Sequence, residues 1–103
     1  MSTTEVRVVR VYIDESEHKL KLLLSLLHDE LEVLGVTVFR GIAGFGPSGK
    51  IHGGGIVDLA MDLPLVVEFF DTPDKASDAM ERLKEHVKPA HMICWQAETD
   101  MEG

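Results

Sequence analysis

The sequence contains one cysteine and no apolar run long enough to cross a membrane. Because Cys94 has no second cysteine to pair with, the fold must be held by its hydrophobic core, and we expect a cytoplasmic protein without direct membrane insertion. Basic residues are also few, 10 against 18 acidic residues, which gives a net charge of −8. Nucleic-acid binding depends on neutralising phosphates, so this balance argues against DNA or RNA as a partner.

Glycine occurs at only nine positions, but seven of them lie between Gly41 and Gly55. Such a cluster indicates a backbone that adopts positive φ, moves, or approaches a ligand closely. The stretch contains Lys50 and His52 and no acidic residue. It is therefore the place where the sequence predicts function, and a small anion is a suitable ligand.

The whole sequence predicts one domain over residues 1–103, built from strands and two helices. A long leucine-rich helix, capped by Asp14 or Ser16, is expected to end at Gly35, and a second helix is expected to begin at Thr72 and Pro73 and to stop at Pro89. The glycine-rich stretch is expected to form an extended hairpin or a flap, and residues 97–103 an acidic flexible tail. Strands are expected at Val6–Ile13, Val36–Arg40, Leu63–Asp71 and Ala90–Ala97.

The resulting order, strand, helix, strand, strand, helix, strand, predicts an α+β ferredoxin-like sandwich with a long glycine-rich loop between the second and third strands. In this plan both helices cover one face of the sheet. The other face should be polar in a monomer, but it is apolar here, so we expect another subunit to cover it. The apolar residues assigned to this second face are Val6, Val8, Tyr12, Val66, Phe70, Ile93 and Trp95.

Several motifs are better explained without catalysis. The run Gly44–Lys50 matches a phosphate-binding P-loop, but Ile51 replaces the required Ser or Thr, and Gly53–Gly55 cannot form the helix that must follow. The same missing helix excludes a dinucleotide fingerprint. No nucleophile has an adjacent base, so we expect a protein that is not an enzyme.

The histidines divide into two groups. His18, His28 and His86 are interpreted as surface residues, and Cys94 as a small core residue that cannot share a metal with His91 across a strand. His52 is either a ligand contact or a solvated loop side chain.

The chain resembles the PII-like signalling proteins, and most closely their branch called domain of unknown function 190. The residues that carry this resemblance are the run from Thr37 to Gly46, which includes Arg40-Gly41-Ile42-Ala43-Gly44-Phe45-Gly46, then Ile51-His52, and then Asp62-Leu63-Pro64. The resemblance implies a homotrimer that requires no cofactor but binds an adenine nucleotide as a regulatory ligand between subunits, and it implies a membrane channel or transporter as a partner. The ligand-binding residues carried over are Arg40, Gly41, Gly44, Phe45, Gly46, Gly49, Lys50, His52, Lys88 and His91.

The leading hypothesis is a non-enzymatic sensor in which a bound anion orders the glycine-rich loop, and the loop then acts on a partner. Three other hypotheses remain open at this point. A metal-binding module would use His52 with Asp58 or Asp62, an enzyme would need a pocket lined by His91 or Asp71, and an oligomeric scaffold would bind only protein through its loop.

Overall fold

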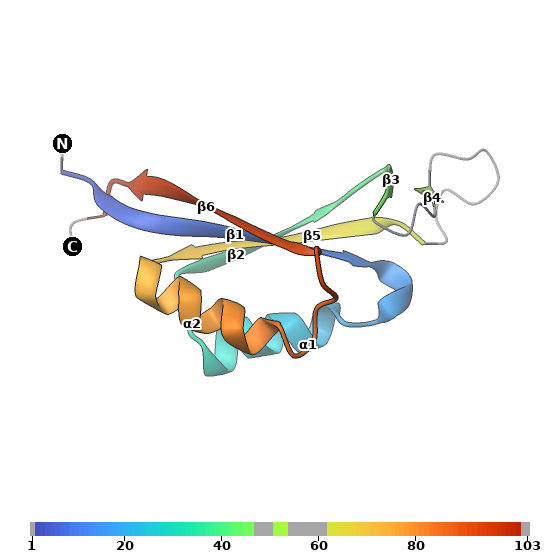
Figure 1. Ribbon diagram of the computed structural model, residues 1–103, viewed down its shortest axis with the longest axis horizontal. Coiled ribbons are helices and arrows are strands. Elements are labelled where there is room, and N and C mark those ends of the chain that lie inside the picture. The colour runs from blue at the N-terminus through green and yellow to red at the C-terminus, as the bar shows by residue number, and fades with distance from the viewer. Residues whose placement is uncertain (1, 47–50, 54–61, 102–103) are drawn as a thin grey trace.

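The computed structural model describes residues 2–46, 51–53 and 62–101, and it consists of a four-stranded sheet with helices on one face (Figure 1). The sheet has the order β2-β5-β1-β6, and every neighbouring pair is antiparallel. This is the ferredoxin-like arrangement that the order of elements predicts. The strands of the sheet are β1 (Thr4–Asp14), β2 (Gly35–Arg40), β5 (Pro64–Asp71) and β6 (Met92–Thr99).

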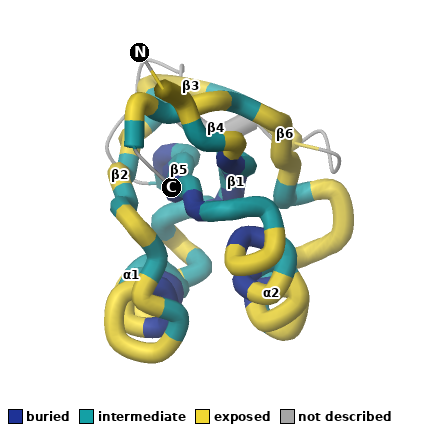
Figure 2. The backbone as a smooth tube through the Cα atoms, turned by 90° about the vertical axis from the view of Figure 1, so that its left-hand side faces the viewer, coloured by how far each residue is buried: buried dark blue, intermediate teal, exposed yellow. Residues whose placement is uncertain are grey.

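The hydrophobic core lies between the sheet and two helices, α1 (Leu20–Ser25) and α2 (Pro73–Leu83). In Figure 2 the buried parts of both helices face the sheet and their exposed parts face outward. Pro73 occupies the first turn of α2, where its missing N–H costs nothing, so the predicted start of this helix is confirmed. The innermost residues are aliphatic and aromatic side chains of the alternating strands and the inner helix faces: Val9, Val11, Val67, Phe69, Leu23, Leu27, Ala76, Ala79 and Leu83.

The first helix is shorter and more irregular than predicted. Asp14 caps a separate 3₁₀ turn, η1 (Glu15–Glu17), which contains Ser16, and α1 continues into a π-helical segment, η2 (Leu26–Glu30). The prediction that Gly35 ends the helix is wrong, because Gly35 begins β2. Glu32 takes the left-handed conformation instead, with φ of 48°. Leu34 is consequently outside the helix and half exposed.

The opposite face of the sheet carries apolar side chains around a central ion pair. Arg10 Nε lies 2.7 Å from Glu68 Oε1, and the guanidinium sits 5.9 Å from the ring centroid of Phe39 and 5.4 Å from that of Trp95. The hydrogen bond to Glu68 raises the pKa of Arg10, which therefore stays charged. Val6, predicted to be exposed here, is instead buried within the chain. The other apolar residues of this face are intermediate or exposed, as Trp95 is at 41%.

Two details at the edge of the sheet also differ from the sequence predictions. Cys94 is exposed rather than part of the core, because β6 is an edge strand that pairs only with β1. The same strand continues to Thr99, so residues 97–99 belong to the sheet and not to a tail. The glycine-rich stretch contributes a second small sheet, in which β3 (Ala43–Phe45) pairs with β4 (Ile51–Gly53), so its described part forms the predicted hairpin.

Candidate functional site

A cavity of about 500 Å³ lies where the hairpin meets the end of the main sheet. Its wall comes from three parts of the chain that are far apart in sequence: the end of β1, the segment from Gly41 to Gly46 with the start of β5, and the turn that precedes β6. The wall is mostly apolar, with a few polar groups, which is the usual composition of a small-molecule site. The lining residues are Tyr12, Ile13, Asp14, Gly41, Ala43, Gly44, Phe45, Gly46, Pro64, Val66, Lys88, Ala90 and His91.

The turn before β6 presents Lys88 and His91 to this cavity. Ala90, between them, has a φ of 65°, which is a left-handed conformation that a non-glycine residue rarely adopts. The turn is fixed by two backbone hydrogen bonds, from the N–H of His91 to the Lys88 carbonyl at 3.2 Å and from the N–H of Tyr12 to the His91 carbonyl at 2.8 Å. These contacts hold the wall of the cavity against β1.

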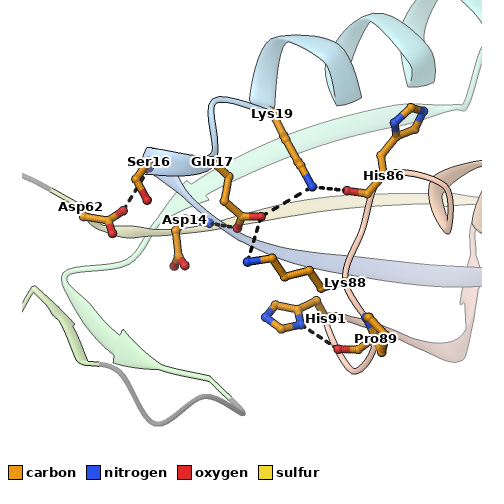
Figure 3. Close-up of polar contacts among 9 residues, drawn as sticks. All are labelled: Asp14, Ser16, Glu17, Lys19, Asp62, His86, Lys88, Pro89 and His91. Carbon is orange, nitrogen blue, oxygen red and sulfur yellow. Dashed lines mark hydrogen bonds and ion pairs between the residues drawn. The ribbon is translucent and has the colours of Figure 1, made fainter.

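Lys88 approaches the partly buried carboxylate of Glu17, as Figure 3 shows. Glu17 Oε1 lies 3.7 Å from Lys88 Nζ and 3.8 Å from Lys19 Nζ, and the N–H of Asp14 donates to Glu17 Oε2 at 2.8 Å. Lys19 in turn donates to the carbonyl of His86 at 2.7 Å. Glu17 thereby links η1 to the turn before β6, while the Lys88 side chain remains 59% exposed.

His91 has a defined tautomer in this arrangement. Its Nδ1 lies 2.9 Å from the carbonyl oxygen of Pro89. A carbonyl oxygen can only accept, so Nδ1 carries the proton and donates. In the neutral ring Nε2 is then an acceptor, and it faces the hairpin, 3.7 Å from the point where a Cβ on Gly46 would lie. Figure 3 shows the Lys88 ammonium and the His91 ring on the same side of the turn.

The hairpin is joined to the sheet by a close contact between Gly41 and Pro64. The N–H of Gly41 donates to the Pro64 carbonyl at 2.7 Å. A Cβ on Gly41 would lie 2.8 Å from Pro64 Cγ and 3.3 Å from the Pro64 oxygen, which is too close for any side chain. Glycine is required here by close approach and not by positive φ.

Six of the ten predicted ligand-binding residues line the cavity: Gly41, Gly44, Phe45, Gly46, Lys88 and His91. Gly49, Lys50 and the side chain of His52 lie outside what the structure describes. Arg40 does not line the cavity. It is hydrogen-bonded to Glu15, and this bond raises the pKa of the Arg40 guanidinium.

Sequence reasoning missed the contribution of β1 to the wall, namely Tyr12, Ile13 and Asp14, and it also missed Pro64 and Val66 of β5. The available signal was topological. In a ferredoxin-like sheet the end of the first strand lies beside the start of the third, and here Asp14 is indeed paired with Pro64. The strand at Val6–Ile13 was predicted, but its pairing with the strand at Leu63–Asp71 was not used. The wall of the cavity formed by the end of β1 was therefore not assigned.

The structure also bears on two alternative hypotheses. The described residues contain no group of three or more His, Cys, Asp or Glu side chains that could hold a metal ion, while Asp58 and the side chain of His52 lie outside them. Asp71 lies at the opposite end of β5 from the cavity, is 1% exposed, and accepts from the N–H groups of Leu34 and Thr72. Asp71 therefore cannot line a pocket with His91.

Comparison with known proteins identifies the family. The profile of the family called domain of unknown function 190 (DUF190, described as an uncharacterized ACR) matches residues 6–99. A segment of 50 residues is 40% identical to the UPF0166 protein of Aquifex aeolicus (strain VF5), and this match spans about half of each chain, 48% in both cases. No helix in the described residues is long and apolar enough to cross a membrane.

Solved structures with the same fold align with nearly the whole chain. CPII from Thiomonas intermedia K12, in a structure bound to ADP and bicarbonate, superposes with a TM-score of 0.74 at 14% identity and covers 97% of this chain and 93% of its own. A PII-like signaling protein from Thermus thermophilus superposes with a TM-score of 0.62 at 17% identity and covers 96% and 91%. At such identities the likeness establishes the fold alone. The family match and the shared fold together show that this chain belongs to the DUF190 family and has the ferredoxin-like fold of PII-like proteins.

Proposed function

We propose that this protein is a non-enzymatic regulatory protein of the PII-like kind, which binds an adenine nucleotide in the cavity and signals through the hairpin. The observation that carries the proposal is that one cavity is walled jointly by the hairpin base and by the Lys88–His91 turn. A ligand in this cavity contacts the glycine-rich segment directly, so binding orders it. Glycine-rich segments lose much conformational entropy on ordering, which couples the ligand to whatever the hairpin docks on.

The relatives support this choice of ligand. Two structures of CPII are bound to ADP, AMP and bicarbonate, and that protein is described as nitrogen regulatory and PII-like. In the present chain the described wall combines apolar surface, suitable for a nucleobase, with the ammonium of Lys88, suitable for a phosphate. Lys50, which belongs to the same glycine-rich stretch of the sequence, is a second cation suitable for a phosphate.

The test is calorimetric titration of the purified oligomer with ATP, ADP and AMP. We expect saturable binding of at least one nucleotide and a rise in melting temperature that follows its concentration. Lys88→Ala should weaken binding about tenfold without lowering the melting temperature of the free protein, because hydrogen bonds to charged groups contribute about 1.5–3 kcal/mol and Lys88 is mostly exposed. Lys21→Ala, which removes an exposed lysine of α1, is the matched control. Absence of binding by all three nucleotides would favour a scaffold that binds only protein.

We further propose that the active form is a homotrimer in which the open sheet face is covered by neighbouring subunits. Ile93 pairs with Arg10 in register and so lies on this face, and it is 47% exposed. Ile93→Asp should dissociate the trimer in light scattering, because it places an unpaired charge in the interface. Leu22→Asp is the control, since Leu22 is equally exposed at 47% but lies on α1. A wild-type monomer at micromolar concentration would contradict the proposal.

The partner is proposed to be a membrane channel or transporter, contacted by the hairpin. Ile42, at the base of the hairpin, is 85% exposed and does not line the cavity, so it is available for such a contact. Ile42→Ser should leave nucleotide binding unchanged and abolish co-purification of a membrane protein with the oligomer. If Ile42→Ser retains the same partner at the same yield, the contact lies elsewhere.

A further inference from the structure

The two polar groups on the turn side of the cavity have opposite hydrogen-bonding character. Lys88 offers a cation that only donates, whereas neutral His91 offers Nε2 as an acceptor, because its Nδ1–H is held by the Pro89 carbonyl. A simple anion site would present donors alone. An acceptor next to the cation repels an anion that has no hydrogen to donate and binds one that has.

We propose that His91 makes this cavity selective for anions that carry a hydrogen-bond donor, such as a hydroxyl, over equally charged anions that carry none. The proposal rests on the proposed function, since it concerns the same site, and it makes His91 a specificity-determining residue. The donor could belong to a nucleotide, as a ribose hydroxyl or the adenine amine, or to a free oxyanion. The chemistry that His91 recognises is the same in both cases.

Hydrogen phosphate and sulfate are the sharpest pair of probes, because at pH 8 both are tetrahedral dianions and only hydrogen phosphate carries a proton. Lys88 attracts both equally, so a difference between them reports the acceptor. Each anion is titrated into the full-length oligomer, and binding is followed by the NMR signals of the His91 ring and by competition against ADP. We expect hydrogen phosphate to bind on the order of tenfold more tightly than sulfate, because an unmatched acceptor costs about as much as one hydrogen bond.

Two variants separate the acceptor from the shape of the side chain. His91→Phe keeps a ring and removes the acceptor, so the preference for hydrogen phosphate should disappear. His91→Gln can turn either its amide oxygen or its amide N–H toward the ligand, so the preference should be weaker than in the wild type and stronger than in His91→Phe. Equal binding of the two anions by the wild type, or a preference that survives in His91→Phe, would overturn the inference. The tautomer is tested without any ligand, since ¹⁵N chemical shifts at pH 8 should show a protonated Nδ1 and a bare Nε2. A protonated Nε2 at pH 8 would also overturn it.

The outcomes distinguish this inference from the proposed function. Binding of ADP without any preference between the two oxyanions would retain the nucleotide site and reject the role of His91. A clear preference for hydrogen phosphate without binding of any nucleotide would retain the role of His91 and reject the nucleotide. If no anion binds at all, both are rejected.

Discussion

Each end of the main sheet has a carboxylate that joins neighbouring segments, but the two carboxylates differ in burial and in the partners they accept from. At one end Asp71 is 1% exposed, accepts the N–H groups of Leu34 and Thr72 at 3.2 and 2.7 Å, and lies 3.8 Å from Lys75 Nζ. At the other end Glu17 accepts one N–H, and its lysine partners lie 3.7 and 3.8 Å away, one of them mostly exposed.

This difference means that Asp71 makes fixed contacts that stabilise the fold, whereas the contact between Glu17 and Lys88 can be broken without unfolding. Asp71 joins the start of β2 and the start of α2 to β5, and two of its three contacts are with backbone that cannot leave without unfolding. Lys88, in contrast, can rotate away from Glu17 toward a ligand because its side chain is flexible and solvated. The end of the sheet at Asp71 therefore stabilises the fold, and the end near Glu17 and Lys88 is available for binding.

The largest effect is expected for Asp71→Ala. Two backbone N–H groups lose a charged acceptor, so the free energy of unfolding should fall by about 3 kcal/mol, which corresponds to roughly 12 °C or more in melting temperature for a chain of this size. Thermal unfolding measures this. Glu17→Ala should cost only about 1 kcal/mol, because it removes one hydrogen bond and two longer ion pairs. A loss as large for Glu17→Ala as for Asp71→Ala would show that the two ends do not differ.

An intermediate effect is expected for Gly41→Ala at the cavity end. The added Cβ would lie 2.8 Å from Pro64 Cγ, so the hairpin base must shift, at a cost of about 1–3 kcal/mol. Gly35→Ala is the control at the Asp71 end, since a Cβ there has no atom within 4 Å. NMR shifts of cavity residues should change in Gly41→Ala and stay unchanged in Gly35→Ala. Similar melting temperatures and unchanged spectra in both would mean that the Pro64 contact does not fix the hairpin.

The smallest effect is expected for Glu17→Gln, and it concerns the ligand. Removing the carboxylate releases Lys88 from its ion pair with Glu17. This pair contributes no more than about 1 kcal/mol, because the Lys88 side chain is mostly exposed. ADP should therefore bind roughly twofold to fivefold more tightly in calorimetry. Glu81→Gln is the control, because Glu81 pairs with the exposed Lys84 at 2.9 Å outside the cavity. Weaker binding in Glu17→Gln would mean that Glu17 positions Lys88 for the ligand instead of competing for it.

Most of the fold could be predicted because its determinants are local. Alternating apolar residues predict the strands, and Thr72-Pro73 predicts the start of α2, which the structure confirms. The irregular end of the first helical region could not be predicted. The π-helical segment displaces the leucine pattern, so a left-handed turn at Glu32 ends the region before Gly35 is reached. Helix ends depend on tertiary packing as much as on capping residues.

The candidate site was predicted on its glycine-rich side and less completely on its other walls. A glycine in the sequence can indicate that the backbone lies close to another residue, as Gly41 does to Pro64. The roles of Glu17 and of the end of β1 depend on contacts between segments far apart in the sequence, which no local pattern reports. Arg40 was assigned to the ligand on the resemblance, and in the structure it is hydrogen-bonded to Glu15, 25 residues before it, and does not line the cavity.

The left-handed backbone of Ala90 affects thermal stability and ligand binding in opposite directions. Replacing Ala90 by glycine would relieve a conformational penalty of about 1 kcal/mol and should raise the melting temperature slightly. The same change would also let the turn sample other shapes, so Lys88 and His91 would no longer be presented together before a ligand arrives. At this position greater thermal stability and tighter binding therefore favour different residues.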